Sequence, residues 1–278
     1  MSTKFAAPVL AVSGLGKSYG ERQIIRDIAF HVARSEFVCL VGPSGVGKST
    51  LLRCLAGLAA PSAGQVVFEG RPVAEPPQGL SVVLQDYSRS LLPWMRVLEN
   101  VALPLRAQKA ARAQRNAAAA EALASVGLAG SERLYPWQLS GGMQQRVAIA
   151  RAIVGGPRLL LMDEPFASVD AQTRFDLEDL TLAIRARTGV SVVLVTHDID
   201  EAVYLADRVL ALSGSPASVA ETVEVPFGAE RDQMATRADP RFAALRNRVL
   251  ARVRGLSGDD AAPDLRPPGR SGLNLAAG

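Results

Sequence analysis

The 278-residue sequence predicts an α/β fold built on a mainly parallel sheet. Short apolar runs alternate with stretches of helical periodicity over most of the chain. One of these runs leads directly into a glycine-rich loop, and that loop leads into a helix. Hydrophobic residues make up 48% of the chain and charged residues 21%, a composition typical of a globular protein with a sizeable core.

The elements are expected in a definite order. Residues 9–30 form short strands around a turn at 19–22, a small N-terminal antiparallel β subdomain. A buried strand covers 36–41, and a helix after Thr50 places Leu58 on its apolar face before Gly57 and Pro61 end it. Further strands are expected at 65–68, 81–84, 159–162, 190–196 and 208–212, and helices at 173–187 and 200–206.

The domain organisation follows from where this alternation is interrupted. The alanine-rich stretch 98–126 favours helix, so residues 88–156 are expected to form a helical subdomain inserted in the core. The whole of 9–256 is then a single domain. From 257 to 278 the composition turns to Gly, Asp, Pro, Ala and Arg without periodicity, which predicts a disordered tail.

The glycine-rich loop predicts a phosphate-binding site. Its pattern, Gly42-x-x-x-x-Gly47-Lys48-Ser49, lies between a strand and a helix, so backbone N–H groups and the helix dipole converge on phosphate oxygens. Lys48 is expected to reach the β- and γ-phosphates, and the Ser49 hydroxyl to bind Mg²⁺. The pattern indicates a P-loop NTPase core. The expected nucleotide-binding residues of this segment are Gly42, Pro43, Ser44, Gly45, Val46, Gly47, Lys48, Ser49 and Thr50.

A second apolar run, residues 159–162, ends at two acidic residues. Asp163 is expected at the carboxyl end of a buried strand, where it would hold Mg²⁺ through water. Glu164 is the candidate to polarise the attacking water. Alone, such a pair would be ordinary surface charge; behind a phosphate loop it favours metal binding and catalysis.

Residues 139–146, Leu-Ser-Gly-Gly-Met-Gln-Gln-Arg, resemble the signature segment of the ATPase subunits of ABC transporters. In that family, Ser140, Gly141 and Gly142 would contact the γ-phosphate of ATP held by the opposite subunit. The physical chemistry agrees, because a helix N-terminus with small first residues is a ready anion site. Taken alone, the same residues would also suit a simple N-cap and turn.

Four more positions follow the pattern of this family in order. Gln85 resembles the glutamine that binds magnesium and acts as the hinge to the helical subdomain. Asp170 resembles an aspartate that shapes the dimer interface around the nucleotide. His197 resembles the histidine that contacts the γ-phosphate and shares catalysis with the acidic residue after the buried strand. Tyr19 resembles the aromatic residue that stacks on adenine.

Within the family, several segments are similar to importers of nitrate, sulfonates, taurine and related small solutes. They are residues 91–94, 97–104, 135–140 and 196–203, together with Met143. Two departures stand out. Extra residues separate Gln85 from 91–94, and Ala-Ser-Val-Asp at 167–170 varies the commoner Ser-Ala-Leu-Asp. Because the first departure lies where the ATPase would meet its permease, the solute stays open.

The resemblance implies an ATPase that uses ATP and Mg²⁺, forms a head-to-tail homodimer and drives a separate integral-membrane permease. A periplasmic or extracellular solute-binding protein would belong to the same system. We expect the chain on the cytoplasmic face of the cell membrane, because it contains no secretory signal and no stretch of about 18 apolar residues. A net charge of +4 does not by itself indicate a nucleic-acid partner, and none is expected.

Two alternative functions explain fewer of these residues. A soluble ABC ATPase acting on DNA or the ribosome would carry a long coiled-coil insertion or two nucleotide cassettes, and the sequence shows neither. A P-loop kinase or GTPase would leave Gln85, Ser140 and His197 unexplained.

Overall fold

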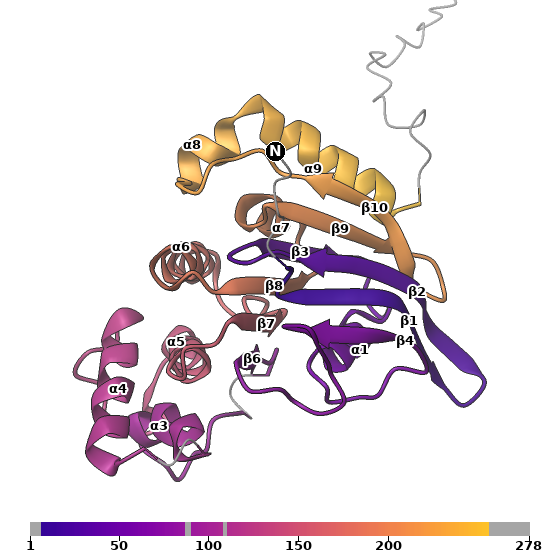
Figure 1. Cartoon of the computed structure of the whole chain (residues 1–278). Coiled ribbons are helices and arrows are strands. Elements are labelled where there is room, and N and C mark those ends of the chain that lie inside the picture. Colours follow the sequence, from indigo (N-terminus) through magenta and orange to yellow (C-terminus); the bar gives the residue numbers. More distant parts are fainter. Residues whose placement is uncertain (1–6, 87–89, 108–109, 256–278) are drawn as a thin grey trace, which may run out of the picture.

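A computed structural model describes residues 7–86, 90–107 and 110–255 (Figure 1). The tail expected at 257–278 lies outside the described residues. The chain forms a central six-stranded sheet, a smaller four-stranded sheet and helices that cover the central sheet.

The central sheet has the strand order β10-β9-β3-β8-β7-β6. Five of its strands run parallel, which confirms the predicted sheet: β3 (Phe37–Val41), β6 (Leu80–Val83), β7 (Leu159–Asp163), β8 (Ser191–Thr196) and β9 (Arg208–Ser213). The edge strand β10 (Ser218–Glu224) is antiparallel to β9 and was not expected. Only Val223 of β10 is buried, so this edge strand carries almost no hydrophobic alternation that sequence reasoning could detect.

Alternate residues of the central strands face two separate hydrophobic cores. In β3, Val38 and Leu40 pack toward α1 (Lys48–Leu55) and the small sheet, whereas Phe37, Cys39 and Val41 pack on the opposite side. That opposite side is covered by α5 (Gly141–Ile153), α6 (Ala171–Thr188) and α7 (Ile199–Leu205). β3, β7, β8 and β9 are therefore buried on both faces, as their continuous apolar runs predict, whereas the edge strand β6 is only partly buried.

The small sheet is antiparallel, as expected from residues 9–30. Its order is β2 (Arg22–Val32), β1 (Leu10–Tyr19), β4 (Ala63–Phe68) and β5 (Arg71–Pro72). Tyr19 and Arg22 are paired at the end of the β1–β2 hairpin, where the turn was expected. Glycine is required where β1 and β4 cross: Gly64 has φ +71°, and a Cβ there would lie 2.2 Å from the carbonyl oxygen of Gly14.

The first helix is shorter than expected. α1 ends at Leu55, and Leu58, which the apolar pattern placed on its buried face, is 56% exposed. The reason is that Gly57, the residue before Leu58, adopts φ +71°, a left-handed conformation that ends the helix.

The helical subdomain consists of α3 (Val97–Ala107), α4 (Arg112–Ser125), the short helix η1 (Pro136–Gln138) and α5. Figure 1 shows α3, α4 and α5 gathered at the lower left of the molecule. Two further helices, α8 (Gln233–Ala238) and α9 (Pro240–Val253), follow β10, and α9 packs on β9 and β10. Among the described residues, no helix has both the length and the apolar character needed to cross a membrane.

Candidate active site

The carboxyl ends of three neighbouring strands bring the predicted catalytic residues together. β3, β8 and β7 are adjacent and parallel, and they end at the phosphate loop, His197 and Asp163 respectively. β6 pairs with β7, and Gln85 follows two residues after β6 ends. Because parallel strands end at the same edge of a sheet, residues far apart in the sequence share one site.

The phosphate loop is shaped by glycines. Gly45 and Gly47 have φ +76° and +117°, a region that residues with a Cβ rarely adopt. A Cβ on Gly42 would approach the carbonyl oxygen of Leu212 to 2.9 Å. Helix α1 begins at Lys48 without a side-chain cap and without an acidic residue in its first turn. Its first N–H groups are therefore available to a phosphate.

Lys48 lies across this loop and is 5% exposed. Its Nζ donates to the carbonyl oxygens of Gly42 at 2.8 Å and Pro43 at 3.1 Å, and lies 3.7 Å from Oε1 of Glu164. Burial lowers the pKa of Lys48, and the carboxylate of Glu164 acts in the opposite direction. A buried ammonium group held mainly by two carbonyls fits a site built to receive an anion.

Ser49 and Asp163 form an oxygen pair next to the loop. The Ser49 hydroxyl donates to Oδ1 of Asp163 at 3.2 Å, and burial raises the pKa of Asp163 while this hydrogen bond opposes the rise. A cavity of about 530 Å³ opens here, with Ser49, Gln85 and Asp163 among its lining residues. Hydroxyl, carboxylate and amide oxygens are the ligands that Mg²⁺ prefers, so these three residues fit the expected ion.

Glu164 is the residue on which the other predicted groups converge. Its Oε2 accepts a hydrogen bond from Nε2 of Gln85 at 3.3 Å and lies 3.1 Å from Nδ1 of His197. Its backbone has φ +43°, unusual for a residue with a Cβ, and its N–H donates to the carbonyl of Val195 at 2.8 Å. Such backbone strain concentrates at functional sites.

The signature segment forms a second group of predicted residues. Ser140 caps α5, its Oγ accepting from the N–H of Met143 at 3.3 Å, and both Ser140 and Gly141 are exposed. A Cβ on Gly142 would lie 2.5 Å from Cγ2 of Thr173 in α6. Glycine is therefore needed where the start of α5 meets α6.

Asp170 belongs to this second group through Thr173. Asp170 caps α6: its Oδ1 accepts the N–H of Thr173 at 3.0 Å and its Oδ2 accepts the Thr173 hydroxyl at 2.6 Å. These hydrogen bonds lower the pKa of the exposed Asp170 carboxyl. In the described part of the chain, the hydrogen bonds of Ser140 stay within α5 and do not reach the phosphate loop.

Tyr19 stands apart from both groups, at the end of β1. Its side chain is 52% exposed, and Nζ of Lys17 lies 4.9 Å from the ring centroid. The ring is thus accessible, as stacking on a base requires.

Sequence reasoning missed residues that connect these parts. Arg151, near the end of α5, donates to the carbonyl of Ser90 at 2.6 Å and to its hydroxyl at 2.7 Å. Arg174 of α6 binds Asp198, the residue after His197, at 3.2 Å. Both are arginines within helices, where a solvated role is the usual expectation, so only tertiary structure reveals their partners.

The arrangement has counterparts among known proteins. The sequence profile of the family described as "ABC transporter" matches residues 25–167. The taurine import ATP-binding protein TauB of Yersinia pestis bv. Antiqua (strain Antiqua) is 44% identical over 249 residues, covering 88% of this chain and 97% of the relative. The aliphatic sulfonates import ATP-binding protein SsuB 2 of Burkholderia cenocepacia (strain HI2424) is 45% identical over 245 residues, covering 88% and 87%.

Solved structures agree with these relatives. The post-hydrolysis dimer of the ATP-binding cassette MJ0796, bound to ADP and Pi, superposes with a TM-score of 0.68 at 29% identity, covering 79% of this chain and all of the other. CbiO1 from Clostridium perfringens, part of the ABC transporter complex cbiONQ, gives 0.72 at 25% identity, covering 86% and 99%. On the sequence profile, the relatives and the fold together, this chain belongs to the ABC transporter family as one of its ATP-hydrolysing subunits.

Proposed function

We propose that this chain powers import of a small solute of the taurine, sulfonate or nitrate type by hydrolysing ATP in sites that two copies complete together. The observation that carries the proposal is the division of the predicted residues into two groups. Lys48, Asp163 and Glu164 meet at one sheet edge, whereas Ser140 and Gly141 are exposed at a helix start. An uncovered anion-binding helix start is what a partner's γ-phosphate needs.

The phosphate loop and its lysine would hold the nucleotide. Lys48 would exchange its two carbonyl partners for the β- and γ-phosphate oxygens and so satisfy its buried charge. Ser49, Asp163 and Gln85 would hold Mg²⁺, which when bound neutralises charge on the β- and γ-phosphates. The ring of Tyr19 would stack on the adenine.

Glu164 would act on the attacking water. Its carboxylate would orient the water and accept its proton as the bond to the γ-phosphorus forms, while the bond from that phosphorus to the β,γ-bridging oxygen breaks and ADP leaves. His197 lies against Oε2 of this carboxylate, so it fixes the carboxylate and can offer its other ring nitrogen to the γ-phosphate. The N–H groups at the start of α5, supplied by the second copy, would stabilise the charge that develops on the transferred group.

ATP would then join the two copies, and hydrolysis would release them. Ser140, Gly141, Gly142 and Asp170 of each copy would face the nucleotide of the other, in a head-to-tail homodimer. The helical subdomain, next to Gln85, would transmit this motion to a separate permease.

The names of the relatives support the import function and the solute class. TauB is named a taurine import ATP-binding protein, and SsuB 2 an aliphatic sulfonates import ATP-binding protein. We infer a location on the cytoplasmic face of the cell membrane, and a solute-binding protein in the same system. Deleting the gene should abolish uptake of labelled taurine or a sulfonate. Normal uptake of both would exclude these two solutes, and a normal growth phenotype with a ribosomal or DNA association would favour the soluble alternative.

Replacing Ser140 with arginine is expected to block turnover without weakening ATP binding by the isolated monomer. The large cation would fill the exposed surface that must receive the partner's γ-phosphate, while the phosphate loop of the same copy stays intact. We expect the ATPase rate to fall by about 100-fold or more, the size of effect seen when one oxyanion donor is lost. Steady-state ATPase assays and equilibrium binding of a fluorescent ATP analogue measure the two quantities.

Ser13→Arg is the matched control, because Ser13 is an exposed serine on β1, outside both groups. That variant should keep the parental rate. A parallel arm dilutes the parental protein: the rate per molecule should fall as copies separate. Loss of monomer affinity in Ser140→Arg, or a rate per molecule that is constant at every dilution, would contradict the shared site.

A further inference from the structure

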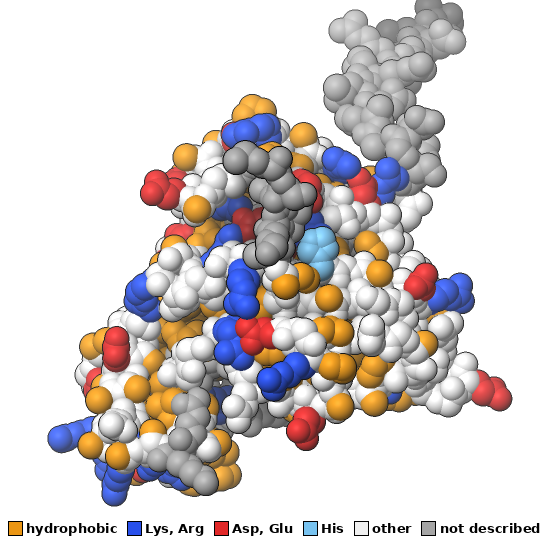
Figure 2. All heavy atoms as spheres, viewed as in Figure 1, with side chains coloured by type: hydrophobic (Ala, Val, Ile, Leu, Met, Phe, Trp, Pro, Cys, Tyr) orange, Lys and Arg blue, Asp and Glu red, His pale blue; other side chains and the backbone are white. Residues whose placement is uncertain are grey.

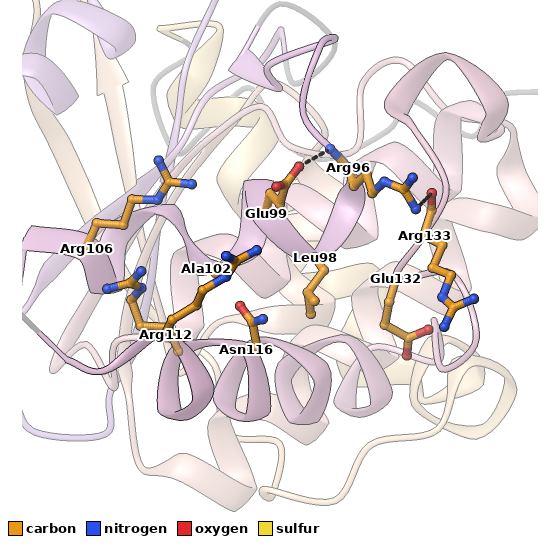
Figure 3. A pocket seen from close by; sticks show the side chains of 10 residues that line it. Arg96, Leu98, Glu99, Ala102, Arg106, Arg112, Asn116, Glu132 and Arg133 are labelled. Carbon is orange, nitrogen blue, oxygen red and sulfur yellow. Dashed lines mark hydrogen bonds between the residues drawn. The ribbon is translucent and has the colours of Figure 1, made fainter.

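A second charged cavity lies in the helical subdomain, between α3, α4 and the segment before η1. Its volume is about 380 Å³. Leu98 and Ala102 of α3 supply apolar lining, and Asn116 of α4 adds an amide (Figure 3). The remaining lining is mostly basic: Arg96, Arg106, Arg112, Arg115 and Arg133.

These five arginines are not neutralised by neighbouring carboxylates. Among the described residues, no carboxylate oxygen lies within 4.0 Å of a guanidinium nitrogen of these arginines, so none of them forms an ion pair. The two acids of the cavity are turned to backbone donors: Glu99 accepts the N–H of Arg96 and Glu132 the N–H of Gly130, each at 3.0 Å. The lining thus carries five positive groups and two negative ones, and Arg96 also donates to the carbonyl of Arg133 at 3.4 Å.

Arginines on the last helix behave differently. Arg248 and Arg252 of α9 both bind Glu221, so this chain does pair arginines with carboxylates where both are at hand. Uncompensated charge of one sign inside a cleft attracts ions of the opposite sign, because the low-dielectric walls focus the field.

The start of α4 adds to this field. Ala111 occupies its N-cap and offers no side-chain acceptor, and its first turn contains no acidic residue but does contain Arg112 and Arg115. Cations oppose the helix dipole at this end, so the arrangement is unfavourable until an anion is added.

The arginines surround the space from two sides. Figure 3 shows Arg106 of α3 and Arg112 of α4 at one end of the cavity, and Arg96 and Arg133 at the other. Arg115 is held by a hydrogen bond to the carbonyl of Ala110 at 2.6 Å. In Figure 2, blue side chains project at the lower left, over the helical subdomain. Guanidinium forks match the oxygens of a tetrahedral oxyanion.

We propose that this cavity binds a phosphate group, either free phosphate or the phosphate of an anionic lipid headgroup. The proposal is independent of the catalytic reading, since no residue of the cavity contributes to the phosphate loop or to the signature surface. Two arginines from different helices would clamp the anion, and its charge would relieve their mutual repulsion.

The test uses the full chain saturated with Mg²⁺ and a non-hydrolysable ATP analogue, so that the phosphate loop is filled. One arm titrates inorganic phosphate by isothermal calorimetry. The other sediments the protein with vesicles of phosphatidylglycerol and phosphatidylcholine, or of phosphatidylcholine alone. The double variant Arg106→Gln and Arg112→Gln should bind inorganic phosphate, or the phosphatidylglycerol vesicles, about tenfold or more weakly than the parental chain. The reason is that two charge-assisted contacts are lost.

The control combines Arg187→Gln with Arg254→Gln. These two exposed arginines lie outside the cavity, so the control removes the same total charge from another part of the surface. Retained binding of the ATP analogue shows that each variant is folded. A selective loss of phosphate binding supports a free anion, and a selective loss of vesicle binding supports a headgroup. The proposal is overturned if neither probe binds, if Arg106→Gln with Arg112→Gln binds normally, or if the control loses binding equally.

Discussion

Replacing Glu164 with glutamine is expected to lower the rate of ATP hydrolysis by about two to four orders of magnitude and to leave ATP binding intact. Glutamine has nearly the same shape, so its carbonyl oxygen can still accept the hydrogen bond from Gln85. It cannot take the proton of the attacking water. The change also removes a negative charge 3.7 Å from Lys48, where the γ-phosphate would add more. The variant should therefore accumulate as an ATP-bound dimer.

Three measurements define this result. Steady-state assays give the rate, equilibrium binding gives the ATP affinity, and size-exclusion chromatography with and without ATP gives the oligomeric state. Glu69→Gln serves as the control, because Glu69 is an acidic residue paired with Arg158 on the surface and should not affect turnover. Hydrolysis at the parental rate in Glu164→Gln would refute the catalytic assignment.

Lys48→Ala is expected to abolish productive ATP binding, with a loss in affinity of about 100-fold or more. The ammonium group is buried and donates to two loop carbonyls, so it is the positive charge held at the position that a phosphate would occupy. Nucleotide binding is measured at equilibrium, because a lost rate alone would not distinguish binding from chemistry.

Lys48→Met separates the charge of this side chain from its volume. Methionine fills a similar space but cannot bind phosphate, so its ATP affinity should match that of Lys48→Ala. Burial lowers the pKa of Lys48, which means that the folded protein bears a cost for holding the charge there. Lys48→Met should therefore unfold at the parental temperature or above it. Parental ATP affinity in Lys48→Met would rule out the proposed electrostatic role.

Features that depend on neighbouring residues in the sequence could be predicted. The phosphate loop could be placed because glycine spacing, an apolar strand and a helix occur together, and the buried strand ending at Asp163 because its apolar run is continuous. The division of the predicted residues into two groups agrees with the resemblance to ABC ATPases, although their individual roles stay predictions.

Features that depend on tertiary packing could not be predicted. The positive φ of Glu164 leaves no trace in the sequence, because it occurs where the backbone of Glu164 bonds to Val195, a residue about 30 positions further along the chain. The close approach of Gly142 to Thr173 joins segments about 30 residues apart. The burial of Leu58 was predicted wrongly because the apolar periodicity of the sequence continues past Gly57. In the structure the helix has already ended there, and Leu58 is exposed.

The contact between Arg151 and Ser90 connects α5 to the segment that follows Gln85. The 13 residues of α5 span about 20 Å. Ser140 lies at the N-terminal end of this helix, and Arg151, which is hydrogen-bonded to Ser90, lies near the C-terminal end. We expect a helix connected in this way to carry motion along its length as a rigid element. A shift of the backbone at Ser90 is therefore expected to move the end of α5 that carries Ser140 relative to the phosphate loop.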